Sequence, residues 1–450
     1  MGQWIHRLNS IHFYIAWALL ITLTTITQAQ EPSNWTYPIV DTGQRHLFTD
    51  RIQLTNMPRE NQRWYGQDAQ FSSNPPRYQD NHDGTTTDLV TGLMWEKALH
   101  KNKTFKQAQQ DASNLKTSGY TDWRLPTLKE LYSLIDFNGC VHTRNPVPYI
   151  DTKYFDFKWG NQVSSRNRAI DAQFWSATQY VGTTMNGNAT VFGVNFADGR
   201  IKGYPRDRKR TFVRYVRGNP DYGINHLVDN KNKTISDTAT GLMWAKVDSK
   251  KTMNWENALN YAKKSKLAGH TDWRLPNAKE LQSIVDYTRA PDAKRSSQRG
   301  PAIDPIFRIT KTESYFWTST THLDGVRYYD HAVYLAFGQA MGYFAPPRSN
   351  QSKKFINVHG AGAQRSDPKS GNPNSSRYKS GHGPQGDDIR INNYVRVVRN
   401  INPDQVTTGK LSTDRVPVLS PQNNMKDSQS NSQRSSDNHR PHDRKPPPRR

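Results

Sequence analysis

The amino-acid sequence predicts an α+β protein of two tandem homologous domains, each with two helices followed by a short-stranded antiparallel sheet. Three observations lead to this fold class. Five sequence blocks occur twice in the same order, helix-capping pairs precede helical periodicity in each copy, and alternating segments with turn residues follow them. A chain of 450 residues is long enough for two domains that each bury a core.

The repeat is the strongest signal in the sequence. Its blocks are TGLMW at 91–95 and 240–244, TDWRLP at 121–126 and 271–276, KEL at 129–131 and 279–281, an aromatic block at 174–178 and 316–320, and a Val-Arg block at 213–217 and 395–399. Solenoid repeats are roughly 20–50 residues long, much shorter than these units. We therefore expect two homologous domains, at residues 79–218 and 228–400.

Two helices are expected early in each copy. Thr104 and Gln107 have the spacing of a capping box, and the same logic applies to Thr127 with Glu130 and to Asn277 with Glu280. The first helix should bury one apolar face and end near Gly119 or Gly269. The expected buried positions are Phe105, Ala108 and Ala112, then Trp255, Ala258 and Ala262, and, in the second helices, Leu131, Leu134 and Ile135 with Leu281, Ile284 and Val285.

Strands are expected in the later half of each copy. Residues 190–196 alternate, and Asp198-Gly199 has the composition of a hairpin turn into Arg200-Ile201. Residues 333–337 are the counterpart in the second copy. Segments 212–217 and 394–399 should close each unit as strands with basic residues on one face.

The remaining segments have other compositions. Residues 1–29 have the layout of a signal peptide, with an uncleaved membrane anchor as the alternative. Residues 30–78 form a polar leader without a clear period, and residues 407–450 a basic tail expected to be disordered. Residues 359–388 have no counterpart in the first copy, so an irregular loop is expected, either shaping a binding surface or simply lying on the surface. The signal segment implies export to the periplasm, the cell surface or the medium.

Composition narrows the classes of function. Lys and Arg number 62 against 39 Asp and Glu, a formal charge of +23, which favours an anionic partner. Export makes nucleic acid a poor candidate, so polysaccharide, lipopolysaccharide or a surface protein remains. The single cysteine, Cys140, excludes intramolecular disulfides, Cys-rich zinc sites and a CxxC redox centre.

The densest charge lies near the end of the first domain. Guanidinium groups bind sulfate, phosphate or carboxylate with two hydrogen bonds, and aromatic rings pack against sugar faces. The predicted anionic-glycan contacts are Arg200, Lys202, Tyr204, Arg206, Arg208, Lys209 and Arg210. Arg214 and Arg217 are three residues apart and cannot share one face of a strand. A solvated loop and a charged strand face is the alternative interpretation.

The tryptophan motifs favour a structural role over sugar stacking. The residues concerned are Trp95, Asp122, Trp123 and Arg124 in the first copy, and Trp244, Asp272, Trp273 and Arg274 in the second. Asp122 with Arg124, and Asp272 with Arg274, have the spacing for an ion pair or for capping backbone groups.

Metal binding and catalysis receive little support. The segment 81–84 followed by Asp88 resembles part of a calcium loop but lacks its terminal ligands, so an ordinary turn is favoured over a loose Ca²⁺ site at Asp83 and Asp88. No other cofactor is expected. Cys140 has His142 nearby, yet the second copy has no equivalent thiol, and an inert cysteine is favoured. We expect a protein that is not an enzyme.

These blocks together resemble the Lcl C-terminal domain family, formerly a domain of unknown function, whose naming member is the tail of a bacterial collagen-like adhesin. The resemblance implies a C-type-lectin-like fold and surface location, and supplies no catalytic residues. Many relatives carry Cys where this chain has Tyr215 and Val397, so no disulfide is transferred. Asp198 lies in an F-x-D-G turn that the second copy lacks at 337–340.

The sequence as a whole predicts an exported, non-enzymatic binding or adhesion protein that recognises anionic polysaccharide or another surface polyanion. The alternative is an envelope scaffold or protein-interaction module without glycan binding. The sequence leaves the oligomeric state open, and a membrane is involved only through an uncleaved signal segment.

Overall fold

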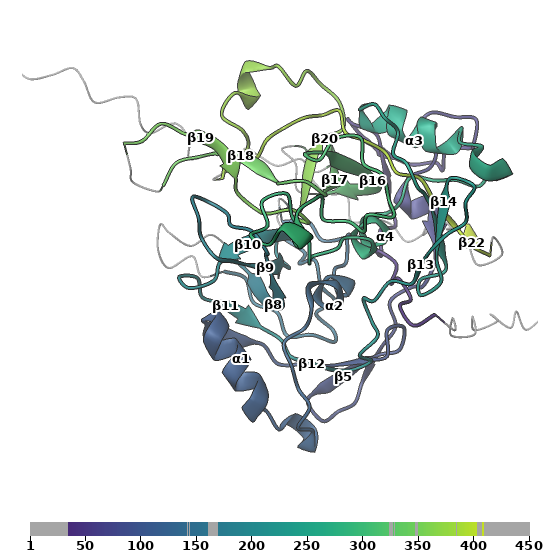
Figure 1. Ribbon diagram of the computed structural model, residues 1–450. Helices are drawn as coiled ribbons and strands as arrows, with labels where there is room; N and C mark the ends of the chain where they lie inside the picture. The colour runs from purple at the N-terminus through teal and green to yellow at the C-terminus, as the bar shows by residue number, and fades with distance from the viewer. Residues whose placement is uncertain are drawn as a thin grey trace, which may run out of the picture. The chain divides into compact units, whose positions relative to one another are not determined.

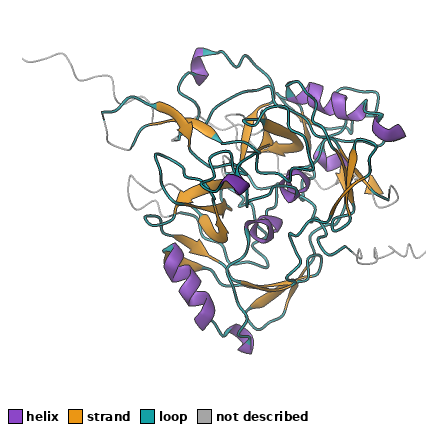
Figure 2. Cartoon of the chain, in the orientation of Figure 1, coloured by secondary structure: helices purple, strands orange, loops and turns teal. Residues whose placement is uncertain are grey.

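A computed structural model describes residues 35–141, 143, 145–160, 170–323, 327, 329–346, 350–383, 385–402 and 407–408. The predicted signal peptide and nearly all of the predicted tail lie outside these residues. Strands and loops make up most of the described chain, as Figure 2 shows, and the α-helices are few. No helix in the described part is long and apolar enough to cross a membrane.

Each repeat contributes two α-helices, as the capping pairs predict. They are α1 (Phe105–Asn114), α2 (Leu128–Ser133), α3 (Trp255–Lys263) and α4 (Ala278–Ser283). The hydroxyl of Thr104 accepts from the amide of Gln107, and Thr127 caps α2 in the same way. Helices α2 and α4 are shorter than the sequence indicates, since Leu134 and Ile284 already lie at their C-caps, although both side chains are buried.

One eight-stranded sheet runs through both repeats (Figure 1). Its spatial order is β16 (Tyr315–His322), β17 (His331–Ala336), β20 (Gln364–Pro368), β10 (Arg200–Pro205), β9 (Thr190–Asn195), β8 (Gln173–Gln179), β11 (Thr211–Val213) and β7 (His100–Lys103). The predicted hairpin is confirmed: β9 and β10 pair antiparallel, and Gly199 in the turn has φ +63°. One pair departs from the predicted antiparallel pattern, because β8 and β11 are parallel.

Each repeat also has a four-stranded antiparallel sheet. In the first repeat it holds β4 (Tyr78–Asp80), β5 (Thr85–Asp88), β6 (Leu93–Glu96) and β12 (Val216–Gly218). In the second it holds β13 (Leu227–Asp229), β14 (Thr234–Asp237), β15 (Leu242–Ala245) and β21 (Val398–Asn400). The remaining strands pair in twos: β1 (Leu47–Phe48) with β2 (Gln53–Leu54), β3 (Phe71–Ser72) with β22 (Thr407–Thr408), and β18 (Met341–Phe344) with β19 (Lys354–Asn357).

The prediction that residues 359–388 form an irregular loop is wrong, because the segment contains a strand of the main sheet. It contains β20, which pairs with β17 as β10 pairs with β9, so β20 is the second repeat's counterpart of β10. The hairpin of β18 and β19 lies between β17 and β20 along the chain and hides this relation in the sequence. Ile201 of β10 pairs antiparallel with Gln364 of β20. Ile201 and Gln364 occupy equivalent positions in the two repeats, since they pair with Val194 of β9 and Leu335 of β17. Equivalent residues of the two repeats thus face each other, as a local twofold arrangement requires.

The polar leader is also more ordered than its composition indicates. From residue 35 on it packs against both repeats and buries Tyr37, Ile39, Leu47 and Phe48. The leader has no regular hydrophobic period, and hydrogen bonds from polar side chains hold it in place. For example, the side chain of Gln67 accepts from the amide of Phe48. A single buried apolar cluster includes leader residues and the core tryptophans Trp95 and Trp244 of the two repeats.

Candidate functional site

The predicted basic segment divides into a buried half and an exposed half. Arg200 and Lys202 are 8% exposed and Tyr204 is 7% exposed, so the prediction that all seven residues share one accessible surface is wrong for these three. They lie on β10, which is covered by β20 and by the loop that starts at His359; the amide of Gly203 donates to the His359 carbonyl at 3.1 Å.

The buried cations belong to a charged cluster at the junction of the repeats. Asp198 Oδ2 lies 3.3 Å from Arg200 Nη1 and 3.2 Å from Lys202 Nζ. Arg200 also donates to the hydroxyl of Ser366 on β20 at 3.3 Å. From the second repeat, Asp387 accepts from Arg365 at 2.9 Å. Buried cations from both repeats thus pair with the buried carboxylates of Asp198 and Asp387, and the cluster contributes to the contact between the repeats.

Lys202 gives this cluster a testable pH dependence. Burial lowers the pKa of its ammonium from 10.5 to about 8, although Asp198 opposes the shift. Because the folded-state pKa lies below the unfolded value, the unfolded chain binds more protons between these values. Stability therefore rises with pH across this window. We expect wild type to gain about 2 kcal/mol from pH 8 to pH 9.5 that Lys202→Met lacks. Urea unfolding of both proteins at the two pH values measures this, and equal pH slopes would contradict it.

The exposed half of the segment is the turn between β10 and β11. Arg208 and Arg210 are exposed, and Arg206 and Lys209 are half-buried. Arg206 donates to Asp207 at 2.9 Å and to Gln179 at the end of β8 at 3.2 Å. On the other side, Arg210 donates to the carbonyl of Asn102 at 3.0 Å, which places it beside β7 and α1.

The β7–β11 pairing adds Lys101, with Lys158 beside it, and sequence reasoning missed both lysines. Lys101 on β7 is exposed, and the adjacent ammonium of Lys158 lowers its pKa. Two like charges held side by side at the surface favour an anion between them. The long-range pairing of β7 with β11 brings Lys101 near the turn. We define the basic surface as Lys101, Lys158, Arg206, Arg208, Lys209 and Arg210.

The motif tryptophans lie in the core in both repeats: Trp95, Trp123, Trp244 and Trp273 are all buried. Their positions favour the structural interpretation, since buried rings offer no face to a sugar. The indole of Trp123 donates to the carbonyl of Thr117 at 3.2 Å.

The acidic and basic residues of TDWRLP pair with different partners from those predicted. Asp122 accepts from Arg217 at 2.6 Å, and Asp272 from Arg399 at 2.8 Å, on the closing strands. Arg124 instead makes two hydrogen bonds to Glu130 of KEL, at 2.7 and 2.6 Å. The two motifs are thus held together by an ion pair in each repeat.

The closing segments do not carry their basic residues on one face. Arg214 and Arg396 are completely buried, and their guanidinium groups donate to backbone carbonyls; for Arg214 these include Glu96 at 2.7 Å. The predicted strand 212–217 is consequently interrupted at this residue and divides into β11 and β12, which join different sheets.

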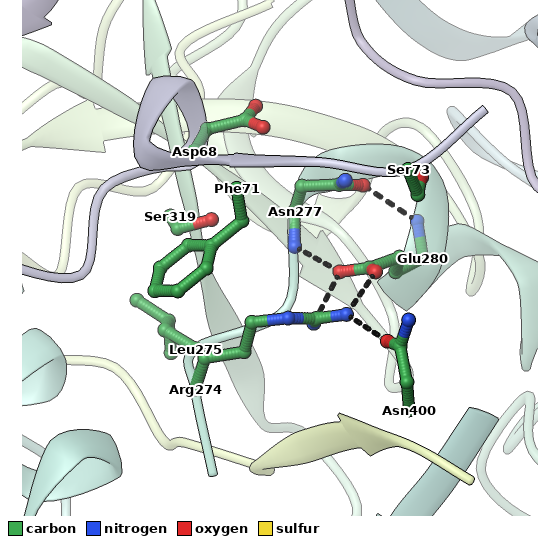
Figure 3. Close-up of a pocket in the computed structure, with 9 residues that line it drawn as sticks. All are labelled: Asp68, Phe71, Ser73, Arg274, Leu275, Asn277, Glu280, Ser319 and Asn400. Carbon is green, nitrogen blue, oxygen red and sulfur yellow. Dashed lines mark hydrogen bonds and ion pairs between the residues drawn. The ribbon is translucent and has the colours of Figure 1, made fainter. Parts of the chain in front are cut away.

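In the second repeat, the Arg274–Glu280 pair lies in a site that the leader fills (Figure 3). Arg274 donates to Glu280 at 2.9 and 2.7 Å and to Asn400 at 2.7 Å. The ring of Phe71 lies beside Arg274, with its centroid 5.9 Å from the guanidinium carbon. The free volume that remains is about 10 Å³, so this site is closed.

In the first repeat, the corresponding pair borders an open groove of about 820 Å³. Arg124 is 37% exposed at its side chain, against 7% for Arg274. The groove lies between α2 and the end of β8 on one side and residues 284–288 of the second repeat on the other, with residues 220–227 between the repeats along its edge.

The residues with calcium-loop character form turns. Asp83 Oδ1 accepts from the amide and hydroxyl of Thr85, at 2.9 and 2.6 Å. Asn232 makes the same two bonds to Thr234 in the second repeat, so a carboxylate is not needed for this role. Asp88 is buried and caps the following turn at the amide of Val90. No cluster of three His, Cys, Asp or Glu side chains suited to a metal occurs among the described residues.

The remaining candidate nucleophile is deep in the protein. Cys140 is buried near Phe48 of the leader and Leu323 of the second repeat. His142 lies outside the described residues. The buried position is that of an apolar core residue.

Comparison with known proteins agrees with the tandem repeat. The family described as the Lcl C-terminal domain matches residues 84–217 and 233–356, more than half of the chain. No curated protein and no solved structure matches the chain. The two matches contain the TGLMW, TDWRLP and KEL blocks of both repeats, and the chain therefore belongs to the Lcl C-terminal domain family, of which it carries two tandem copies.

Proposed function

We propose that the protein is an exported, non-enzymatic adhesin-like protein that binds anionic polysaccharide through the basic surface of its first repeat. A C-type-lectin-like character of each repeat is part of this proposal. The family relationship supports the adhesin-like assignment, because its naming member is the tail of a collagen-like adhesin. Neither a metal nor another cofactor is needed for binding of this kind.

The observation that carries the proposal is the group of exposed cations Arg208, Arg210 and Lys101, in which Arg210 contacts β7 at Asn102, next to Lys101. Lys158 lies beside Lys101. An exposed pair of like charges is unfavourable unless an anion lies near it. Sulfate and carboxylate groups of a polysaccharide supply such anions, and guanidinium groups bind them with paired hydrogen bonds. Arg200, Lys202 and Tyr204 are not part of this proposed contact, because they are buried.

Removal of three exposed cations should weaken polyanion binding strongly. For the triple variant Lys101→Ala, Arg208→Ala and Arg210→Ala, we expect heparin affinity at low salt to fall at least about tenfold. Affinity of wild type should decrease as salt increases, because surface charges are screened. Isothermal titration calorimetry at two salt concentrations measures both effects.

A matched variant separates a local site from total charge. Lys231→Ala, Lys233→Ala and Lys250→Ala remove the same charge from exposed positions of the second repeat. We expect this variant to bind heparin within about twofold of wild type. Equal losses of heparin affinity in the two triple variants would show that binding depends only on the net charge of the protein. Unchanged affinity in the first variant would show that the basic surface is not the binding site.

The alternative function, a protein-interaction module without glycan binding, is favoured by a different observation: the open groove of the first repeat. If the protein does not bind heparin at low salt, this result would favour the protein-interaction module over the polysaccharide-binding protein.

A further inference from the structure

The two grooves are counterparts, and only one is filled. The local twofold arrangement of β10 and β20 places equivalent surfaces on opposite sides of the junction. We call the surface around Arg274 the filled groove and the surface around Arg124 the open groove. The filled groove holds leader residues from the same chain, so its contacts define what a groove of this shape binds.

Leader residues in the filled groove make side-chain and main-chain contacts. The carboxylate of Asp68 accepts hydrogen bonds from the hydroxyls of Thr42 and Thr320. The side-chain amide of Gln44 pairs with the backbone of Thr321 in both directions, at 2.7 and 2.9 Å. On the facing wall, the amide of Phe137 donates to the Thr42 carbonyl at 2.9 Å. The part of the leader that contains Asp68 is a 3-10 turn over Asp68–Gln70, and Phe71 follows it directly.

The open groove retains the same features without an occupant. Residues 319–321 of β16 are all buried, whereas their counterparts Ala177, Thr178 and Gln179 on β8 are exposed, half-buried and exposed. Thr178 makes one of the two contacts of Thr320. Its hydroxyl oxygen accepts from the amide of Leu128 at 2.9 Å, as that of Thr320 accepts from the amide of Ala278. Its hydroxyl hydrogen faces no carboxylate corresponding to Asp68 among the described residues.

The facing wall differs in the same way. Tyr287 is the counterpart of Phe137, yet it is half-buried where Phe137 is fully buried. No backbone carbonyl in the described part of the chain accepts from the Tyr287 amide, whereas the Phe137 amide has the leader carbonyl. A main-chain donor, a hydroxyl donor and a guanidinium therefore line the open groove at the positions that contact the leader in the filled one.

We propose that the open groove binds a turn-forming segment of a partner protein, with a carboxylate three residues before an aromatic residue as in the 3-10 turn from Asp68 to Phe71. The carboxylate contacts the Thr178 hydroxyl, and the aromatic ring lies over the Arg124 guanidinium, an arrangement that cation–π attraction stabilises. The leader of a second copy is not available for this role, since Asp68 and Phe48 are already buried within their own chain.

The charged residues that line the open groove include both signs: Arg124 and Lys129 against Glu130, Asp286 and Asp304. Arg206 donates to Gln179 at the end of β8 and thus lies at the groove's edge. The acidic groups on the opposite wall are already bonded locally: Asp286 accepts from the amide and hydroxyl of Thr288, at 2.9 and 2.6 Å. The Tyr287 amide and the Thr178 hydroxyl remain as donors, which suits a single carboxylate and a main-chain carbonyl of the bound segment.

The probe is a fluorescein-labelled synthetic peptide with the sequence of residues 64–74, which contains both Asp68 and Phe71. We expect saturable binding to the full-length protein with a Kd of about 100 μM or lower, measured by fluorescence anisotropy. Gln179→Trp, at an exposed residue that lines the open groove, should block it and weaken binding at least about tenfold, because a bulky side chain occupies the peptide's place. Ala98→Trp, at an exposed alanine outside the groove, should leave the Kd unchanged.

Photo-crosslinking locates the bound peptide. With benzoylphenylalanine in place of its phenylalanine, the peptide should label the segments around Arg124 and Thr178. Labelling around Arg274 instead would mean exchange with the leader and would overturn the proposal. So would the absence of saturation up to about 1 mM, a range that still detects weak peptide complexes, or equal binding by Gln179→Trp.

Discussion

Asp387→Asn is expected to lower the free energy of unfolding by about 3–5 kcal/mol, because it leaves buried cationic groups without their carboxylate. Asp387 is buried and accepts from Arg365 Nε at 2.9 Å and from His359 Nε2 at 2.8 Å. Arg365 and His359 are buried as well. Attraction to Arg365 and His359 holds the pKa of Asp387 well below its usual range, against the effect of burial.

The effect is large because the pair is buried on both sides. The guanidinium of Arg365 is bonded to the Asp387 carboxylate, while Arg200 and Lys202 of the same cluster pair with Asp198. Loss of the Asp387 charge leaves the buried Arg365 guanidinium without this carboxylate, and an asparagine side chain cannot neutralise it.

Urea unfolding at pH 7 measures this loss. Asp207→Asn is the matched control, because Asp207 is 69% exposed at its side chain and pairs only with Arg206 in the turn. We expect the control to change stability by less than about 0.5 kcal/mol. A loss below about 1 kcal/mol in Asp387→Asn would show that water or a rearranged partner compensates at the junction.

Local features of the fold were accessible from the sequence. The capping pairs Thr104–Gln107 and Thr127–Glu130 act over three residues, so the beginnings of α1 and α2 follow from the chain itself. The Asp198-Gly199 turn is equally local. The repeat then extended each of these predictions to the second copy.

The burial of the basic segment was not accessible, because it depends on long-range pairing. β10 is covered by β20, whose Gln364 lies 163 residues after Ile201. The alternation of β10 gives no sign of this, and the inserted hairpin of β18 and β19 hides the counterpart strand. Lys101 was missed for the same reason: its position beside the turn depends on pairing of β7 with β11.

The leader shows a second limit of sequence reasoning. Gln44, Gln67 and Asp68 are polar, and composition alone places them in solvent. In the structure all three are buried. The side chain of Gln44 bonds to the backbone of Thr321, and that of Gln67 accepts from the amide of Phe48. Burial of polar residues leaves no hydrophobic period to detect.

The second large effect is expected at the buried arginines of the two closing segments. Arg396 donates to the carbonyls of Ala245 at 2.6 Å and of Lys246 and Arg308 at 2.9 Å each. Burial lowers its pKa to about 10, which shows how strongly the carbonyl groups must compensate for lost hydration. Arg396→Met leaves these acceptors without a donor, and we expect a loss of about 3–5 kcal/mol.

Arg214→Met should have a loss of similar size, since Arg214 has the same role in the first repeat and the same lowered pKa of about 10. Arg217→Met, three residues further on, is the control. The Arg217 pair with Asp122 is partly exposed, and its loss should be about 1 kcal/mol or less.

The shape of the unfolding curve tests the shared sheet. Because β10 and β20 join the repeats in one sheet and one buried apolar cluster, both arginine variants should unfold in a single transition, followed by circular dichroism and tryptophan fluorescence. If Arg214→Met instead produced two transitions, the first repeat would unfold while the second stayed intact. The junction would then be a contact between independent domains, and the open groove, which both repeats line, would lose a wall whenever the first repeat unfolds.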